Sequence, residues 1–170
     1  NGKSKISACN AVDKVLIDEK LQNKTAFINK LISKLNATKI EVLGDAIVSK
    51  NHKLKEISSN EVWYEEFLDY KIVIGQIASN EDAIAMINKY AGGHSSAIIT
   101  KNIDIAKLFM ESIDTAVVYH NASTRFTDGG QLGLGGELAI STDKLHQRGP
   151  IGLQHLVTNK WYVHGDGQTR

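Results

Sequence analysis

The sequence predicts an α/β fold with a mostly parallel sheet and helices on both of its faces. Beyond residue 69 the apolar pattern alternates in the order strand, helix, strand, helix, strand. Short connections between such elements are typical of parallel strands whose helices cover the faces of the sheet. The 170 residues, with 42% hydrophobic content, are enough for one domain with a sizeable core.

Apolar spacing predicts two helices in the first part of the chain. Residues 7–17 show helical spacing with Ser7 as the N-cap, and residues 25–35 carry an amphipathic stripe. The segments that follow are a short strand at 40–43, a short apolar segment at 46–48, and a loop or weak helix at 49–60.

The alternating part begins after two adjacent glutamates. Its predicted elements are a strand at 72–74, a helix at 80–90, a strand at 97–99, a helix at 103–113 and a strand at 116–119. We expect Asn80 to cap its first helix, which Gly92 and Gly93 end. Towards the end of the chain we expect a strand at 138–141, a turn at 148–150, a short helix near 151–156 and a strand at 160–164. The last strand has no partner nearby in sequence, so it is a candidate edge for pairing with another subunit.

The most unusual segment is the loop NASTRFTDGGQLGLGGE at residues 121–137. It holds five of the chain's 14 glycines and directly follows a predicted buried strand. Ligands of parallel sheets gather at the carboxyl ends of the strands, and a glycine-rich loop leaves its backbone N–H groups free to face a ligand. The loop is therefore a candidate binding site, and the alternative is a mobile surface loop.

The single cysteine, Cys9, falls in the first turn of the helix predicted at 7–17. The positive end of a helix, with Lys3 and Lys5 nearby in sequence, favours a thiolate. The alternative is a small buried apolar side chain. One cysteine cannot form an intrachain disulfide, which suits a cytoplasmic location.

Several classes of function find no support in the sequence. The net charge of +1 and the lack of a long apolar run predict neither nucleic acid nor a membrane as partner. The six histidines lack the spacing of a metal site, so we expect no metal. The glycines at 133–136 stand in the wrong context for a dinucleotide fingerprint. The chain also begins without methionine, which suggests part of a longer protein.

Several motifs together resemble one known family. They are Asn1–Lys3, ACNA at 8–11, EDAI at 81–84, HSSAI at 94–98, the loop 121–137, KLH at 144–146 and RGP at 148–150. The chain resembles the gamma-glutamyl phosphate reductases, or glutamate-5-semialdehyde dehydrogenases, of the aldehyde dehydrogenase superfamily. The resemblance runs over nearly the whole chain. The same domain also occurs in bifunctional pyrroline-carboxylate synthases, and the sequence leaves both origins open.

The resemblance implies an aldehyde-dehydrogenase-like catalytic portion without the N-terminal cofactor domain. Residues 1–150 would form the catalytic α/β domain, and residues 151–170 a segment that joins the oligomerisation sheet of a homo-oligomer. Residues 1–170 alone would then be inactive, because the site for the hydride donor would be incomplete.

The resemblance also implies the reaction, in proline biosynthesis. Cys9 would attack the acyl phosphate of L-glutamate 5-phosphate, a small-molecule substrate, and release phosphate to leave a thioester. Hydride from NADPH would then give L-glutamate 5-semialdehyde and NADP.

The same resemblance implies the residues of the substrate site. They are Asn121, Ser123, Thr124, Arg125 and Phe126. We expect Arg125 to bind the phosphate or the α-carboxylate, since a guanidinium group matches both bidentately. The alternative is an ion pair with Asp128 that pins the loop. We expect the segment at 94–96, where Ser96 replaces the family's usual acidic residue, to be structural.

Glu66 lies where the superfamily places a ribose-binding glutamate, in Glu-x-Phe-Gly-Pro. Here the run is EFLDY, so Leu68 replaces the phenylalanine and the Gly-Pro is absent. Glu65 is a rival for the cofactor role, and the alternative is that both carboxylates are simply solvated.

Two other functions remain open at this stage. One is a non-catalytic oligomerisation or regulatory module of the same fold, in which Cys9 is unreactive. The other is the catalytic domain of a general aldehyde dehydrogenase that oxidises free aldehydes.

Overall fold

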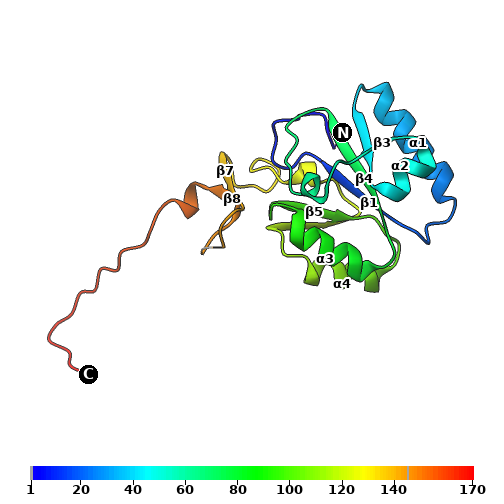
Figure 1. Ribbon diagram of the computed structural model, residues 1–170. Helices are drawn as coiled ribbons and strands as arrows, with labels where there is room; N and C mark the ends of the chain where they lie inside the picture. The colour runs from blue at the N-terminus through cyan, green and yellow to red at the C-terminus, as the bar shows by residue number, and fades with distance from the viewer. Residues whose placement is uncertain (1, 145) are drawn as a thin grey trace.

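The computed structural model describes residues 2–144 and 146–170 (Figure 1). Asn1 and Leu145, which belong to two of the motifs above, lie outside the described residues. The largest sheet, sheet A, contains β1 (Lys14–Asp18), β2 (Glu41–Gly44), β3 (Lys55–Glu56) and β4 (Lys71–Ile77). Its strand order is β1-β4-β2-β3, and every pair is parallel.

Both faces of sheet A are covered. On one face α1 (Lys24–Ala37) and α2 (Ala46–His52) pack over a cluster that includes Ile28, Ile72 and Ile74. On the other face η1 (Asn60–Trp63) and α3 (Asn80–Tyr90) pack over a cluster that includes Trp63 and Val73. Ile72, Val73 and Ile74 are consecutive, so the two-residue period of β4 sends its side chains into both clusters. This arrangement confirms the predicted α/β class.

After α3 the chain forms a second, smaller sheet. Sheet B consists of β5 (Ser95–Ile98) and β6 (Val117–His120), which are parallel and are connected by α4 (Ile103–Ser112). The predicted alternation of strands and helices is therefore right, but β4 belongs to sheet A and does not pair with β5. Local apolar patterns identify strands without saying which strands pair.

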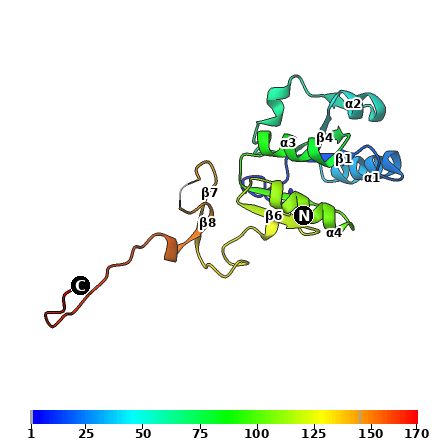
Figure 2. The ribbon, with the colours of Figure 1, turned by 90° about the horizontal axis from the view of Figure 1, so that it is seen from below.

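The last part of the chain leaves the body of the molecule. Strands β7 (Glu137–Ile140) and β8 (Gly149–Gly152) form an antiparallel hairpin, followed by the single turn η3 (Leu153–His155). From there an extended tail runs away from both sheets, as Figures 1 and 2 show. The turn predicted at 148–150 is wrong, because Gly149 and Pro150 belong to β8, an edge strand that tolerates proline.

The predicted final strand at 160–164 is also absent from the secondary structure of the described residues. Its apolar side chains, Trp161, Tyr162 and Val163, are 75–88% exposed. A strand exists only where another strand accepts and donates its backbone hydrogen bonds, and this segment has no such partner here.

The helix predicted at 7–17 is wrong. Turns run through residues 2–11, and residues 14–18 form β1. The run Val15–Leu16–Ile17 alternates between the faces of sheet A, since Ile17 packs in one cluster and Leu16 against the other. A short apolar run fits a helix and a buried strand equally well, and pairing with β4 decides it.

The other predicted helices and strands are present, with bounds that differ by up to three residues. The cap of α3 is Ser79, whose side chain accepts a hydrogen bond from the Asp82 N–H group, and not Asn80. The segment predicted as a loop or weak helix, 49–60, contains most of α2, then β3 and the first residue of η1. Among the described residues, none of the helices is long and apolar enough to span a bilayer.

Candidate active site

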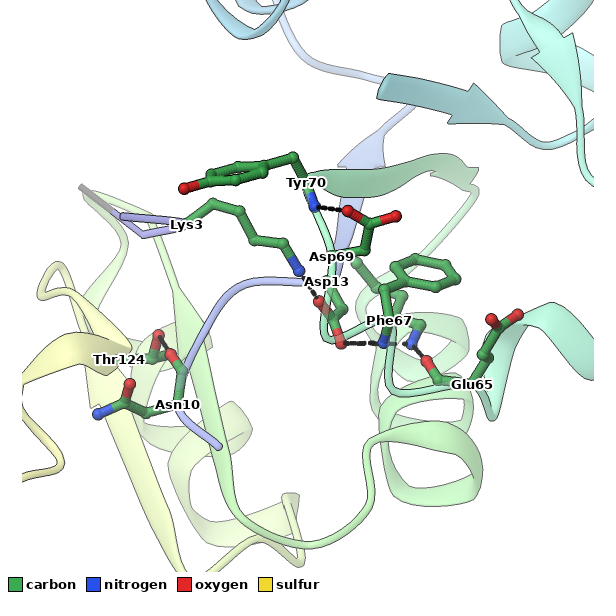
Figure 3. A network of polar contacts seen from close by, with 9 residues as sticks. Lys3, Asn10, Asp13, Glu65, Phe67, Asp69, Tyr70 and Thr124 are labelled. Carbon is green, nitrogen blue, oxygen red and sulfur yellow. Dashed lines mark hydrogen bonds and ion pairs between the residues drawn. The ribbon is translucent and has the colours of Figure 1, made fainter. Parts of the chain in front are cut away.

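A buried ion pair fixes the segment that carries the cysteine. Lys3 is only 5% exposed and pairs with Asp13 at the start of β1 (Figure 3). The second oxygen of Asp13 accepts a hydrogen bond from the Phe67 N–H group at 3.1 Å. Asp13 therefore ties the segment of residues 2–13 to the loop of residues 64–70 that leads into β4.

Lys14 reinforces the same junction. Its ammonium group donates to the carbonyl oxygen of Glu65 and lies 4.5 Å from the centre of the Phe67 ring. Burial lowers the pKa of Lys14, and the negative charge of Asp13 opposes that shift. The junction thus holds Glu65 and Glu66 beside the cysteine segment.

The cysteine faces a histidine from a distant part of the chain. Cys9 Sγ lies 3.3 Å from Nε2 of His94, 85 residues further on. His94 directly precedes β5 and is only 7% exposed, whereas Cys9 is exposed. A thiol and an imidazole at this distance have the geometry that a nucleophile and its base require.

The surroundings shift the pKa of each member of this pair towards its neutral form. Packing around the sulfur raises the pKa of the Cys9 thiol, and the carboxylates of Glu137 and Glu66 raise it further, against backbone N–H groups that lower it. Burial lowers the pKa of His94, although the same two carboxylates act to raise it. The expected thiolate at a helix N-terminus is therefore wrong, since no helix starts there and the thiol is harder to ionise than usual.

Asn10 closes the glycine-rich loop onto the cysteine segment. The side-chain amide of Asn10 donates to the backbone carbonyl oxygen of Thr127 at 2.6 Å. The backbone carbonyl oxygen of Asn10 accepts from the Thr124 hydroxyl at 2.7 Å. The Arg125 guanidinium group donates to the side-chain oxygen of Asn10. Residues 124–127 are thereby placed beside Cys9.

A polar hollow of about 360 Å³ opens next to this contact. Its lining residues are Ser4, Ser123, Arg125, Phe126, Asp128 and Gln131. The volume falls within the usual range for small-molecule sites. Among the described residues Arg125 forms no ion pair with Asp128, whose carboxylate accepts from the N–H groups of Gly130 and Gln131 instead.

Comparison with known proteins identifies the family of this chain. The model of the aldehyde dehydrogenase family matches residues 58–161, more than half of the chain. The chain belongs to the aldehyde dehydrogenase family. This agrees with the fold class that the sequence predicts.

Similar members of the family share one name. A gamma-glutamyl phosphate reductase of Clostridium botulinum is 45% identical over 167 residues, which are 98% of this chain and 40% of that protein. One from Dictyoglomus thermophilum is 45% identical over 96% of this chain and 39% of that protein. The crystal structure of the Thermotoga maritima protein of that name superposes with a TM-score of 0.89 at 40% identity, over 98% of this chain and 40% of that one. The chain thus spans about two fifths of the length of the relatives it matches.

The predicted substrate residues fall into two groups in this family member. Ser123, Arg125 and Phe126 line the hollow. Asn121 and Thr124 are engaged elsewhere: both polar atoms of the Asn121 amide bond the backbone of Thr100, at 3.0 and 2.8 Å, and Thr124 donates to Asn10.

Glu66 is exposed, and its charge acts on both Cys9 and His94. The carboxylate therefore acts on the centre through its charge, from the loop before β4. The backbone carbonyl oxygen of Glu65 accepts a hydrogen bond from Lys14, and the Glu65 carboxylate acts to raise the pKa of Lys14.

Sequence reasoning missed His94. The histidines lacked any metal spacing, and the segment at 94–96 was expected to be structural. The structure instead places His94 against the sulfur, at the amino ends of β1 and β5 and not at the carboxyl ends where a ligand was expected. The available signal is that His94 opens the segment HSSAI, one of the motifs that carry the family resemblance.

Within the described residues, no three or more histidine, cysteine or acidic side chains gather as a metal site would require.

Proposed function

We propose that this chain carries the catalytic portion of an NADPH-dependent reductase. The enzyme would convert L-glutamate 5-phosphate to L-glutamate 5-semialdehyde and phosphate in proline biosynthesis. The observation that carries the proposal is Cys9 Sγ at 3.3 Å from His94 Nε2, beside a polar hollow lined by Arg125. The name shared by the similar relatives supports the choice of substrate.

The first step follows from the neutral pair. His94 Nε2 accepts the proton of the Cys9 thiol, and the resulting thiolate attacks the acyl carbon of the substrate. The bond from that carbon to the phosphate oxygen breaks, and phosphate leaves with the electron pair. A thioester of Cys9 remains.

The second step restores the enzyme. When bound, the nicotinamide cofactor supplies a hydride to the acyl carbon. The bond from carbon to Cys9 sulfur then breaks with its electrons on the sulfur, the aldehyde departs, and the sulfur recovers its proton from His94. No water has to be activated, so no carboxylate base is needed.

Glu66 would help to hold the cofactor. Its exposed carboxylate is near enough for its charge to raise the pKa of Cys9, and it makes no hydrogen bond within the described residues, so it is free to accept hydrogen bonds from ribose hydroxyl groups. These properties fit the role implied by the resemblance. The choice of NADPH over NADH rests on the resemblance alone.

Arg125 would bind an anion of the substrate, with Ser123 beside it and Phe126 against the carbon chain. Arg125 and Ser123 share the wall of the hollow, and Arg125 reaches Asn10, the neighbour of Cys9. Asn121 and Thr124 would support this site indirectly by holding the backbone around it.

We further propose that residues 1–150 form the catalytic part and residues 151–170 an oligomerisation segment of a homo-oligomer. The exposed Trp161, Tyr162 and Val163 support this, since such a cluster is costly to leave in water. A cytoplasmic location and the inactivity of residues 1–170 alone also stay predictions.

The test is NADP⁺ reduction with glutamate 5-semialdehyde in phosphate buffer, using the intact protein as its gene encodes it. We expect turnover that requires phosphate and disappears in Cys9→Ser, with the fold retained. Turnover without phosphate would instead indicate a general aldehyde dehydrogenase. No turnover at all would indicate a non-catalytic module.

A further inference from the structure

The contacts of His94 continue on the far side of its ring. Nδ1 lies 2.8 Å from the hydroxyl oxygen of Ser95, which lies 2.8 Å from that of Thr127. The hydroxyl of Tyr119 lies 2.8 Å from the same Thr127 oxygen. An unbroken chain of hydrogen bonds therefore leads from the Cys9 sulfur through His94 to Tyr119. Its middle member, Thr127, is only 2% exposed.

We propose that Ser95, Thr127 and Tyr119 form a hydroxyl relay that keeps one proton of His94 on Nδ1. Nε2 is then left as an acceptor for the thiol proton of Cys9. These three are positioning residues, because only His94 touches the sulfur. The inference rests on the proposed function in that Cys9 is taken as the nucleophile.

The direction of donation decides what the relay does. A hydroxyl has one proton and two lone pairs, so the proton of Ser95 goes either to Thr127 or to Nδ1. In the first case Ser95 accepts from Nδ1–H, and Thr127 accepts from Ser95 and can accept from the Tyr119 phenol as well. Nε2 then presents a lone pair to Cys9. In the opposite direction Nδ1 would accept and Nε2 would already carry a proton, so the ring could not take the one from the thiol.

The relay also stabilises the state that follows proton transfer. The imidazolium ring carries protons on both nitrogens, and its Nδ1–H then donates a charge-assisted hydrogen bond to Ser95. Thr127 keeps Ser95 in the accepting role, because it takes the proton that Ser95 would otherwise turn towards the ring. Without Thr127 the thiolate and imidazolium pair loses this support.

The surroundings of His94 make such support useful. His94 is only 7% exposed, and burial disfavours the charged form of its ring. The charged groups that act on it are Glu137 from β7 and Glu66 from the loop before β4. Neither forms a hydrogen bond with His94 within the described residues. Ser95 is therefore the group that contacts Nδ1 directly.

The test is the rate at which iodoacetamide alkylates Cys9 in the intact protein, measured against pH without substrate or cofactor. Mass spectrometry of the peptide that contains Cys9 separates it from any other cysteine. Thr127→Val removes the hydroxyl at nearly constant shape and keeps the backbone carbonyl that Asn10 binds. Thr127→Ser is the matched control, since it restores a hydroxyl.

We expect Thr127→Val to slow alkylation about tenfold near neutral pH, a loss typical of groups that orient a functional histidine, while Thr127→Ser stays within about twofold. Above the pKa of Cys9 the rates should converge, because the thiolate then forms without a base. Ser95→Ala should reproduce the loss, and Tyr119→Phe should give a smaller one in the same direction.

An unchanged neutral-pH rate in Ser95→Ala would overturn the proposal, and this variant decides the matter alone if Thr127→Val does not fold. A loss in Thr127→Val that persists at high pH would also overturn it, since that would reflect distortion. The intact protein could also show no turnover while its alkylation rate still falls in Thr127→Val and Ser95→Ala. That result would refute the proposed reaction but support the relay.

Discussion

The ion pair of Lys3 and Asp13 offers a sharp test of how the cysteine segment is held. The two side chains are 2% and 14% exposed. Asp13→Asn keeps an oxygen for the Phe67 N–H group but removes the charge, so the buried ammonium of Lys3 loses its partner. Leaving one charge of a buried pair uncompensated costs about 3–5 kcal/mol. We therefore expect the free energy of unfolding of this region to fall by about that amount.

The assay is hydrogen exchange of peptides from residues 2–13, β1 and β4 in the intact protein, over a urea series. The expected loss equals an increase of about two to four orders of magnitude in the population of the open state. The double variant Lys3→Met with Asp13→Asn should recover part of the stability, because the buried ammonium of Lys3 is gone, whereas Lys14, whose ammonium lies 3.9 Å from Asp13, still loses this partner.

Lys55→Met is the matched control, since it breaks the ion pair between Lys55 and Glu41. The side chain of Lys55 is 77% exposed and that of Glu41 is 49% exposed. Such exposed pairs often contribute nothing measurable. If Asp13→Asn is no less stable than this control, or if the double variant is as unstable as the single one, the reasoning about the buried charge is refuted.

Three further predictions concern the core, the histidine and the substrate site. Gly75→Ala should lower stability by about 1–3 kcal/mol, because a Cβ there would lie 2.7 Å from the Trp63 ring, whereas Gly136→Ala meets nothing within 4 Å; urea unfolding compares the two. The pKa of His94 is lower in the folded protein than in the unfolded chain, where it is about 6.5. As the pH falls below that value the unfolded chain binds a proton before the folded protein does, so the free energy of unfolding should decrease, with a slope of up to about 1.4 kcal/mol per pH unit. His94→Gln should lose this part of the slope in urea midpoints measured against pH, and an unchanged slope would contradict the assignment. Arg125→Lys should raise the KM for glutamate 5-semialdehyde or phosphate about tenfold with a smaller effect on kcat, since the bidentate geometry is lost; equal constants for both proteins in steady-state kinetics would remove Arg125 from the site.

The sequence alone determined the α/β class and most of the helices and strands. Segments such as 25–35 and 103–113 carry their apolar stripe within one element, so their local pattern is sufficient. It also pointed to Cys9 and to the loop of residues 121–137, because motifs of unusual composition are visible without a fold. Both of these lie together at the candidate site.

Only the tertiary structure decided how these parts meet. The run at 15–17 is a strand because β4 pairs with it, and the division into two sheets depends on pairing between segments far apart in sequence. His94 and Thr127 are ordinary residues in the sequence, and His94 is separated from Cys9 by 85 of the 170 residues. Their proposed roles rest on contacts at 3.3 and 2.8 Å, and on surroundings that raise the pKa of the thiol and lower that of the imidazole. Such properties depend on three-dimensional proximity and desolvation, which no local pattern of residues contains.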